Sequence, residues 1–424
     1  MKWSFLVLIF CLCFPFWVEA DTLTLSRAET IALANHPKIK AGVLQEQVGE
    51  TQVKETHAAE LPFVSGNLTG VDAEAGSRIS AGGLNNPLIF SRYANGLSLN
   101  QLITDFGHTH DLVQSSVFHQ KALQTDLEFT RLEVLFQADD AYFSVLRTQA
   151  LLEVAKETVA ERQSVLDQVN ALAKSKLKSG LDLSFAEVNL AQSKLFLVQA
   201  QNDLDAAYMT LSTALGYSEL QRFSLVDEMP YTKPPGNLGD LTALAFQTRE
   251  DLTTLLLERA SAEWYAKAQG AQSLPRIDLA GALGESPYHA PGLSNSYSVI
   301  GINVDIPIFN GNLFSEEEKE AQLKVGIEDQ NVQNLKNQIA HDVGVAWLDV
   351  ETAYQNLALT QKLRRQAAEA LDLAQARYNL GLSSIVELSH AQLNLTQAEI
   401  DKTNAKYAYE VKVLSLDYQV GVKK

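Results

Sequence analysis

The sequence predicts a mainly α-helical protein with a small β portion, built from long coiled-coil hairpins and two β-hairpins. Two stretches without proline, at about 107–179 and 312–380, are long enough for helices of unusual length. Apolar residues recur every seven positions within the helical regions. The same order of local signals also occurs twice along the chain, which indicates an old internal duplication. Each half should therefore contribute a short helix, a longer helix, two strands and a helical hairpin.

The duplication can be followed residue by residue. With a constant offset of 213 positions, Ile39 falls on Leu252 and Leu61-Pro62 falls on Leu274-Pro275. The segment 229–240, MPYTKPPGNLGD, contains three prolines and two glycines and is typical of a linker. The predicted organisation is a first structural repeat over 21–228, a linker over 229–240 and a second structural repeat over 241–424.

The strands are expected after the first two helices of each repeat. We expect short helices at roughly 25–35 and 238–248, and β-hairpins over 61–104 and 274–309. In the second repeat Ile300, Ile302 and Val304 alternate with polar or small residues, which is the strand period of two. The alternation is weaker in the first repeat, where Gln101 interrupts the apolar face. Each repeat would supply two strands, and four strands are too few to close a barrel.

Coiled-coil packing is expected in the helical hairpins. After Gly180, leucines recur every seven residues, and a small residue follows each leucine three positions later: Leu183, Leu190, Leu197, Leu204 and Leu211, with Ala186, Ser193, Ala200, Ala207 and Ala214. This pattern predicts antiparallel hairpins with tips near 180 and 381. Gly180 and Gly381 are expected to end the outgoing helices in the left-handed conformation that glycine adopts readily.

The beginning of the chain and its composition limit the class of protein. Residues 1–20 predict an export signal peptide, because Lys2 is followed by an apolar run and a small residue, Ala20. The only cysteines, Cys11 and Cys13, lie in this segment, so the exported chain should have no disulfide and no thiolate metal site. A formal net charge of -17 argues against nucleic acid as a partner. No later apolar run approaches the ~18 residues that a membrane-spanning helix needs.

The ordered set of features resembles the TolC-like outer membrane efflux protein family over essentially all of the chain after the signal. The features are the duplicated order of elements, the junctions ITDFGH (103–108) and IFNGN (308–312), and the glycine tips followed by an acidic residue and Ala-Gln. The resemblance implies a homotrimer in which three sets of four strands close one twelve-stranded β-barrel in outer-membrane lipid. A periplasmic α-helical barrel would continue it.

The resemblance also implies a function and its partners. The trimer would be the exit duct of a tripartite efflux or type I secretion system, passively conducting substrates that an inner-membrane pump and a periplasmic adaptor deliver. The resemblance implies that the adaptor docks at the two tips, on Ser179-Gly180-Leu181 and Leu380-Gly381-Leu382. The exported substrate is left open, because in such an architecture the pump selects the cargo.

The resemblance places the periplasmic gate just after the second tip. Glu387 matches the first acidic position of the family pattern, and His390 stands where an aspartate is familiar. Three copies of Glu387 would attract cations, whereas three copies of His390 would be neutral or cationic depending on pH. The gate is therefore expected to be less cation-selective in acid than at neutral pH. The alternative is that both side chains only face solvent or a neighbouring hairpin.

No catalytic, cofactor-binding or metal-binding site is predicted. His108 and His110 are two positions apart, so on a helix their imidazoles would point about 200° apart and would not converge on one metal. No phosphate-binding loop or hydrolase motif occurs in the sequence. The alternative function is a soluble periplasmic coiled-coil adaptor or scaffold, which would not need detergent for its extraction.

Overall fold

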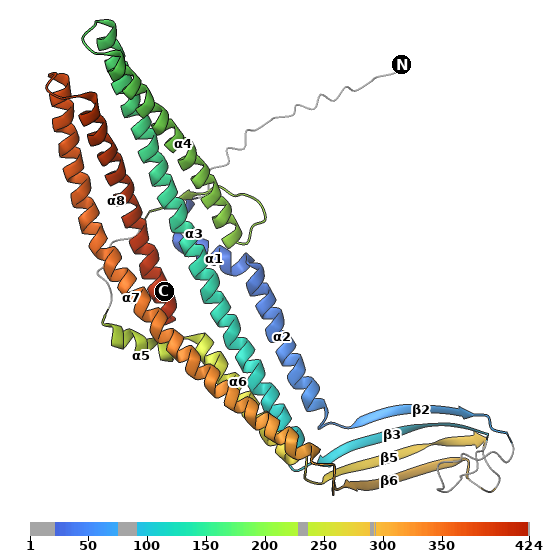
Figure 1. Cartoon of the computed structure of the whole chain (residues 1–424). Coiled ribbons are helices and arrows are strands. Elements are labelled where there is room, and N and C mark those ends of the chain that lie inside the picture. The colour runs from blue at the N-terminus through green and yellow to red at the C-terminus, as the bar shows by residue number, and fades with distance from the viewer. Residues whose placement is uncertain (1–21, 75–90, 228–235, 289–291, 293, 423–424) are drawn as a thin grey trace, which may run out of the picture. The chain divides into compact units, whose positions relative to one another are not determined.

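The computed structural model describes residues 22–74, 91–227, 236–288, 292 and 294–422 (Figure 1). The predicted signal peptide and the linker positions up to 235 lie outside these residues. Elements in the first half of the chain are β1 (Thr22–Leu23), α1 (Leu25–Asn35), α2 (Pro37–Ala58), β2 (Phe63–Val71), β3 (Arg92–Thr104), α3 (His108–Lys174), α4 (Gly180–Ala214) and β4 (Ser224–Leu225). Elements in the second half are α5 (Leu238–Thr248), α6 (Glu250–Ala271), β5 (Arg276–Tyr288), β6 (Ser296–Asp305), α7 (Leu313–Asn379) and α8 (Ile385–Val420).

The short helices α1 and α5 confirm the expected positions at 25–35 and 238–248. Both begin at a side-chain cap: the Thr24 hydroxyl accepts from the Arg27 N–H, and the Asn237 side chain accepts from the Asp240 N–H. Such caps satisfy backbone donors that the first turn of a helix leaves unpaired. Because α5 begins at Leu238, positions 238–240 of the predicted linker belong to this helix.

The chain divides into two compact units, and both contain segments from each half of the sequence. The first unit comprises the chain up to Pro37, Glu133–Gly236 and Val345–Tyr418, and the second comprises Lys38–Leu132, Asn237–Gly344 and the chain from Gln419. The units therefore do not follow the predicted repeats, which describe the order of elements along the chain. As domain boundaries, the two repeats remain a prediction.

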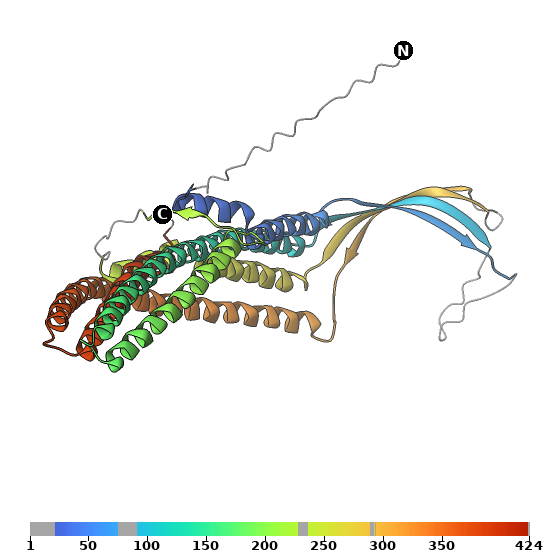
Figure 2. The same ribbon diagram turned by 90° about the horizontal axis from the view of Figure 1, so that it is seen from above.

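The second unit contains a four-stranded antiparallel sheet in the order β2-β3-β5-β6. Figure 1 shows the strands side by side, and Figure 2 shows their twist. The two predicted hairpins join through the pairing of β3 with β5, where Leu97 lies opposite Leu283. Because side chains alternate along a strand, one face of the sheet carries Leu, Ile and Val, and the other carries mainly small and polar residues.

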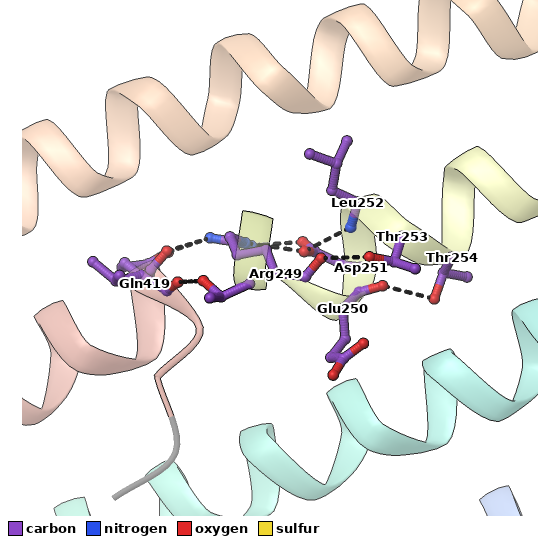
Figure 3. A network of polar contacts seen from close by, with 9 residues as sticks. Arg249, Glu250, Asp251, Leu252, Thr253, Thr254 and Gln419 are labelled. Carbon is purple, nitrogen blue, oxygen red and sulfur yellow. Dashed lines mark hydrogen bonds and ion pairs between the residues drawn. The ribbon is translucent and has the colours of Figure 1, made fainter. Parts of the chain in front are cut away.

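The end of α8 is anchored at the start of α6 in the second unit (Figure 3). Arg249 is buried and makes an ion pair with Asp251, with 2.6 Å between Nη2 and Oδ2. Its Nη1 also donates to the side chain and the backbone carbonyl of Gln419, at 2.9 and 3.2 Å. Thr248 completes the junction, because its hydroxyl donates to the Val420 carbonyl at 2.5 Å.

The predicted coiled-coil seam is present in α4, and its small residues are the most uniformly buried part. Leu190, Leu204 and Leu211 are buried, whereas Leu183 and Leu197 remain partly exposed. All five positions of the small-residue stripe are buried: Ala186, Ser193, Ala200, Ala207 and Ala214. Short side chains let neighbouring helices approach closely, so this stripe faces the core of the first unit.

The two hairpin tips use the same helix ending but different residues. After α7, the Gly381 N–H donates to the Tyr378 carbonyl and the Leu382 N–H donates to the Arg377 carbonyl, with Gly381 at φ 71°. This is a Schellman ending, as expected. After α3 the equivalent bonds come from Lys176 and Leu177, and the left-handed residue is Lys176 at φ 59°. The expectation for Gly180 is therefore wrong: it is the first residue of α4.

Candidate functional site: the hairpin tips and the gate region

Ser179 and Gly180 form the start of α4 at the first tip. The Ser179 hydroxyl accepts from the Asp182 N–H at 3.2 Å, and the Ser179 N–H donates to the Asp182 carboxylate at 2.9 Å. This reciprocal arrangement is a capping box. Burial opposes ionisation of Asp182, but the two hydrogen bonds from Ser179 and the charge of Lys178 outweigh it and lower the pKa of Asp182. The first tip is thus held by a charged cap.

Leucines dominate the exposed surface of both tips. Leu181 is 67% exposed at the first tip, and Leu380 and Leu382 are 74% and 66% exposed at the second. A further member, Leu177, is 71% exposed beside the left-handed turn and was not predicted from the sequence. Exposed apolar side chains gathered at the ends of hairpins are typical of an interaction surface. The predicted docking residues therefore lie where a partner could reach them.

Glu387 and His390 lie one turn apart near the start of α8, and both are exposed. The Glu387 carboxylate lies 3.0 Å from Nε of Arg377 on α7, so this acidic group is paired across the second tip. Arg377 was not predicted from the sequence, although an antiparallel hairpin brings together residues at similar distances on either side of its tip. The pairing reduces the net negative charge that Glu387 presents.

Behind the exposed surface, the two hairpins share an apolar cluster in the first unit. Tyr378 of α7 is 1% exposed and packs with Val165, Val169 and Ala186, joined by Ile385 and Leu388 of α8. The ammonium group of Lys178 lies 3.8 Å from the centroid of the Tyr378 ring, a cation–π contact. Burial, with the nearby charge of Asp182, raises the pKa of the Tyr378 phenol. The first tip thus closes over an aromatic ring from the second hairpin.

Farther from the tips, hydrogen bonds between polar side chains link the two hairpins. The Asn189 side chain donates to the Ser389 hydroxyl at 2.7 Å, and the Gln392 side chain donates to Glu161 at 3.2 Å. Arg162, only 4% exposed, donates to the Thr396 hydroxyl at 3.1 Å. Burial lowers the pKa of Arg162, and its ion pair with Glu161 works in the opposite direction. Polar hydrogen bonds of this kind fix the register between the hairpins.

His108 lies at the junction of β3 and α3. Nδ1 of His108 lies 2.7 Å from the Ala268 carbonyl, so this imidazole is engaged with the backbone of α6. Across the described residues, no group of three or more His, Cys, Asp or Glu side chains is arranged to hold a metal ion. No helix in the same residues is both long and apolar enough to cross a membrane.

Known proteins match the chain over most of its length. The model of the outer membrane efflux protein family matches residues 30–217 and 241–422. The outer membrane protein TolC of Salmonella enteritidis is 23% identical over 78% of this chain and 71% of its own length. TolC of Vibrio cholerae serotype O1 is 22% identical over 96% of this chain and 94% of its own length. The crystal structure of the Campylobacter jejuni CmeC outer membrane channel has a TM-score of 0.80 at 19% identity, covering 94% of this chain and 85% of that chain.

Proposed function

Because the chain belongs to the outer membrane efflux protein family, we propose that it is the exit duct of a tripartite efflux or type I secretion system. Membership places the protein in the outer membrane, among channel proteins. In our proposal it acts passively: an inner-membrane pump and a periplasmic adaptor deliver the substrate, and this chain conducts it across the outer membrane.

One observation carries the proposed assembly: the sheet has free edges and an exposed apolar face. In the described residues β2 and β6 are the edge strands, and neither pairs with a further strand. Leu68, Ile300 and Ile302 are 67–73% exposed. In lipid, unpaired strand edges are too costly to persist, so the edges need strands from other copies. Three copies of four strands would close one twelve-stranded barrel, with the apolar face toward lipid and the small, polar face toward the lumen.

The tips are proposed to bind the adaptor. The exposed leucines Leu181, Leu380 and Leu382 support this assignment, together with the short backbone turns at Lys176 and Gly381. An adaptor with apolar residues at the end of its own helical hairpin would cover these leucines. Leu177 extends the same surface and joins the proposed docking residues.

Glu387 and His390 are proposed to line the periplasmic gate. Three copies of Glu387 near the axis would favour cations, and each Arg377 would moderate that field. Protonation of three His390 side chains in acid would add positive charge. The proposed gate is therefore less cation-selective in acid than at neutral pH.

Fractionation and mass determination test the assembly. We expect the processed protein in outer-membrane fractions, to require detergent for extraction, and to give the mass of a trimer by light scattering. A water-soluble monomer would refute the duct and favour the alternative, a periplasmic coiled-coil adaptor or scaffold.

Ion selectivity in planar bilayers tests the gate. Glu387→Gln should lower the cation selectivity at neutral pH, and Arg377→Gln should raise it. His390→Gln should abolish the difference between acid and neutral pH. Glu369→Gln, an exposed carboxylate of α7, is the matched control and should behave like the wild type. Wild-type selectivity in all three gate variants would contradict the assignment.

A further inference from the structure

Two glycines and a tyrosine lie in one row across the sheet. Gly96 of β3 pairs with Gly284 of β5, and Gly284 pairs with Tyr297 of β6. Residues paired in this way project from the same face of an antiparallel sheet. The row therefore places one large aromatic side chain beside two consecutive positions that have no side chain.

The Tyr297 side chain lies along the sheet and over both glycines. A Cβ atom on Gly284 would come within 2.6 Å of the Tyr297 hydroxyl oxygen, and a Cβ atom on Gly96 would also collide with this hydroxyl. The same oxygen lies 3.4 Å from the Asn95 carbonyl of β3, two strands away from β6. Only a ring lying flat across β5 reaches that carbonyl. The glycines thus form a shallow trough that the tyrosine fills, leaving it 41% exposed.

The trough lies on the face proposed to line the lumen. Strand register places on this face the polar residues Ser65, Asn67, Ser98, Asn100, Asp278 and Asn303. The side chains of Asn67 and Ser98 are hydrogen-bonded to each other at 3.0 Å, which shows that they share the face. The opposite face carries Val64, Leu97 and Ile300, which suit lipid contact.

We infer that Gly96 and Gly284 keep the bore of the duct open in its strand region, because they let the Tyr297 ring lie flat against the wall. This inference rests on the proposed function. In a trimer, three tyrosines standing upright would narrow the lumen, whereas three flat rings leave it open. Any side chain at Gly96 would displace the ring toward the lumen, because a packed neighbour cannot occupy the trough at the same time.

Gly96 also lies close to the backbone of the neighbouring strand, and an experiment must separate this contact from the contact with Tyr297. A Cβ atom on Gly96 would also lie 2.6 Å from the Leu283 carbonyl, so a substitution there presses on the backbone of β5 as well as on the tyrosine. The two causes differ in one respect. A narrowing caused by the displaced ring is reversed when the ring is removed, and a narrowing caused by distorted strands is not.

Polymer exclusion in planar bilayers measures the bore. Neutral polyethylene glycols of graded size are added to the strand side of the trimer, and the largest polymer that lowers the conductance gives the exclusion limit. Gly96→Ala should shift this limit to smaller polymers, and Gly96→Ala with Tyr297→Ala should return it at least to the wild-type value. Gly301→Ala is the matched control, because Gly301 shares the face and has no atom within 4 Å of an added Cβ. It should leave the limit unchanged.

The outcomes are distinct. If the wild type forms no channel, the proposed function fails. If it conducts, any one of three results overturns the inference. The exclusion limit of Gly96→Ala equals that of the wild type, the exclusion limit of Gly301→Ala is shifted, or the double variant keeps the smaller exclusion limit of Gly96→Ala. If Gly96→Ala does not assemble, Tyr297→Ala alone decides. A flat ring occupies little of the lumen, so its removal should barely move the exclusion limit, and a marked widening would show that the ring stands in the duct.

The assignment of the faces has its own test. No cysteine occurs after residue 20, so a thiol reagent applied to the processed protein reacts only with a cysteine that has been introduced. Val299 and Ile300 are neighbours on opposite faces of β6 and are 63% and 73% exposed. A charged, membrane-impermeant thiol reagent should reduce the conductance of Val299→Cys and leave Ile300→Cys unaffected. The reverse result would place Tyr297 against lipid and overturn the inference.

Discussion

At the scale of single residues, two buried tyrosines of the first unit differ in whether their hydroxyls are satisfied. The Tyr142 hydroxyl lies 2.8 Å from the Leu23 carbonyl and 2.7 Å from the Val226 carbonyl. The Tyr378 hydroxyl is buried without a hydrogen-bond partner in the described part of the chain. A buried hydroxyl without a hydrogen-bond partner destabilises the folded state, whereas a hydrogen-bonded one stabilises it. Replacing tyrosine by phenylalanine should therefore change the free energy of unfolding differently at the two sites.

We expect Tyr142→Phe to lower the free energy of unfolding by about 1 kcal/mol, and Tyr378→Phe to leave it unchanged or raise it. Thermal melting of the detergent-solubilised protein, followed by circular dichroism, compares the two variants. A larger loss in Tyr378→Phe than in Tyr142→Phe would mean that the Tyr378 hydroxyl has a partner, such as ordered water.

The cap at the first tip should depend on pH. The pKa of Asp182 is below its ordinary value of 3.8 in the folded chain. Because the pKa of this carboxyl group is lowered on folding, the group stabilises the folded chain fully above pH 3.8. This stabilisation is lost as the pH falls through the lower pKa of the folded state. Acid should therefore loosen the first turn of α4.

Hydrogen exchange of the amides in this turn tests the cap. Asp182→Asn keeps the shape and removes the charge, so it should reduce their protection at neutral pH. The difference from the wild type should vanish at a pH below the folded pKa of Asp182. Asp167→Asn, an exposed carboxylate on α3, is the control. Equal protection in the Asp182 variant and the wild type at neutral pH would refute the role of the charge.

At the scale of elements, the two tips share one type of helix ending, but the glycine of the sequence motif takes the left-handed position in only one of them. Gly381 has a positive φ, and a side chain there is strained even though the space around it is open. Gly180 has no such conformation and is the first residue of α4, where open space also surrounds it. The two glycines are therefore not equivalent in their effect on folding.

We predict that Gly381→Ala lowers the free energy of unfolding by about 1 kcal/mol, because alanine is strained in the left-handed region. Gly180→Ala should be neutral or slightly stabilising, because alanine favours the helix. Melting temperatures compare the pair. If Gly180→Ala weakens adaptor binding without changing stability, the glycine serves docking. A melting temperature lowered equally in both variants would contradict the distinction.

At the scale of the whole molecule, the end of the chain is tied to a helix junction that lies far from it in sequence. Arg249 makes this link in the second unit through Asp251 and Gln419 (Figure 3). A buried charged group whose partner is removed is left uncompensated, which is costly. The junction should therefore be sensitive to truncation of Arg249.

We expect Arg249→Ala to lower the free energy of unfolding by about 2 kcal/mol, since it leaves the half-buried Asp251 carboxylate without its ion-pair partner and removes the hydrogen bonds to Gln419. Arg365→Ala, at an exposed site on α7, is the control and should change it by less than about 0.5 kcal/mol. Limited proteolysis of the chain after Gln419 provides a local readout. Unchanged stability and unchanged cleavage would show that the anchor contributes nothing.

Much of the element order follows from local sequence signals. The helices at 25–35 and 238–248 and the alternation at 300–304 were predicted correctly, because caps and periodicity are properties of neighbouring residues. The heptad pattern predicted the coiled-coil seam but overestimated how many of its leucines are buried, since Leu183 and Leu197 stay partly exposed. The error at Gly180 has a similar origin: the motif contains a glycine, but the Schellman bonds form four residues earlier, at Lys176.

The sequence by itself determined the order of the helices and of the four long strands, and the approximate positions of both tips, because short-range periodicity and turn chemistry encode them. The two-residue strands β1 and β4 were not predicted. Only the tertiary structure decided which side chains meet across the repeats. It joined Arg162 to Thr396, Glu387 to Arg377 across a tip, and Tyr297 to the trough at Gly96 and Gly284. Arg162 and Thr396 are about half the chain apart in sequence, and so are Gly96 and Tyr297. Their geometry depends on strand register and helix packing, which a local sequence pattern does not specify.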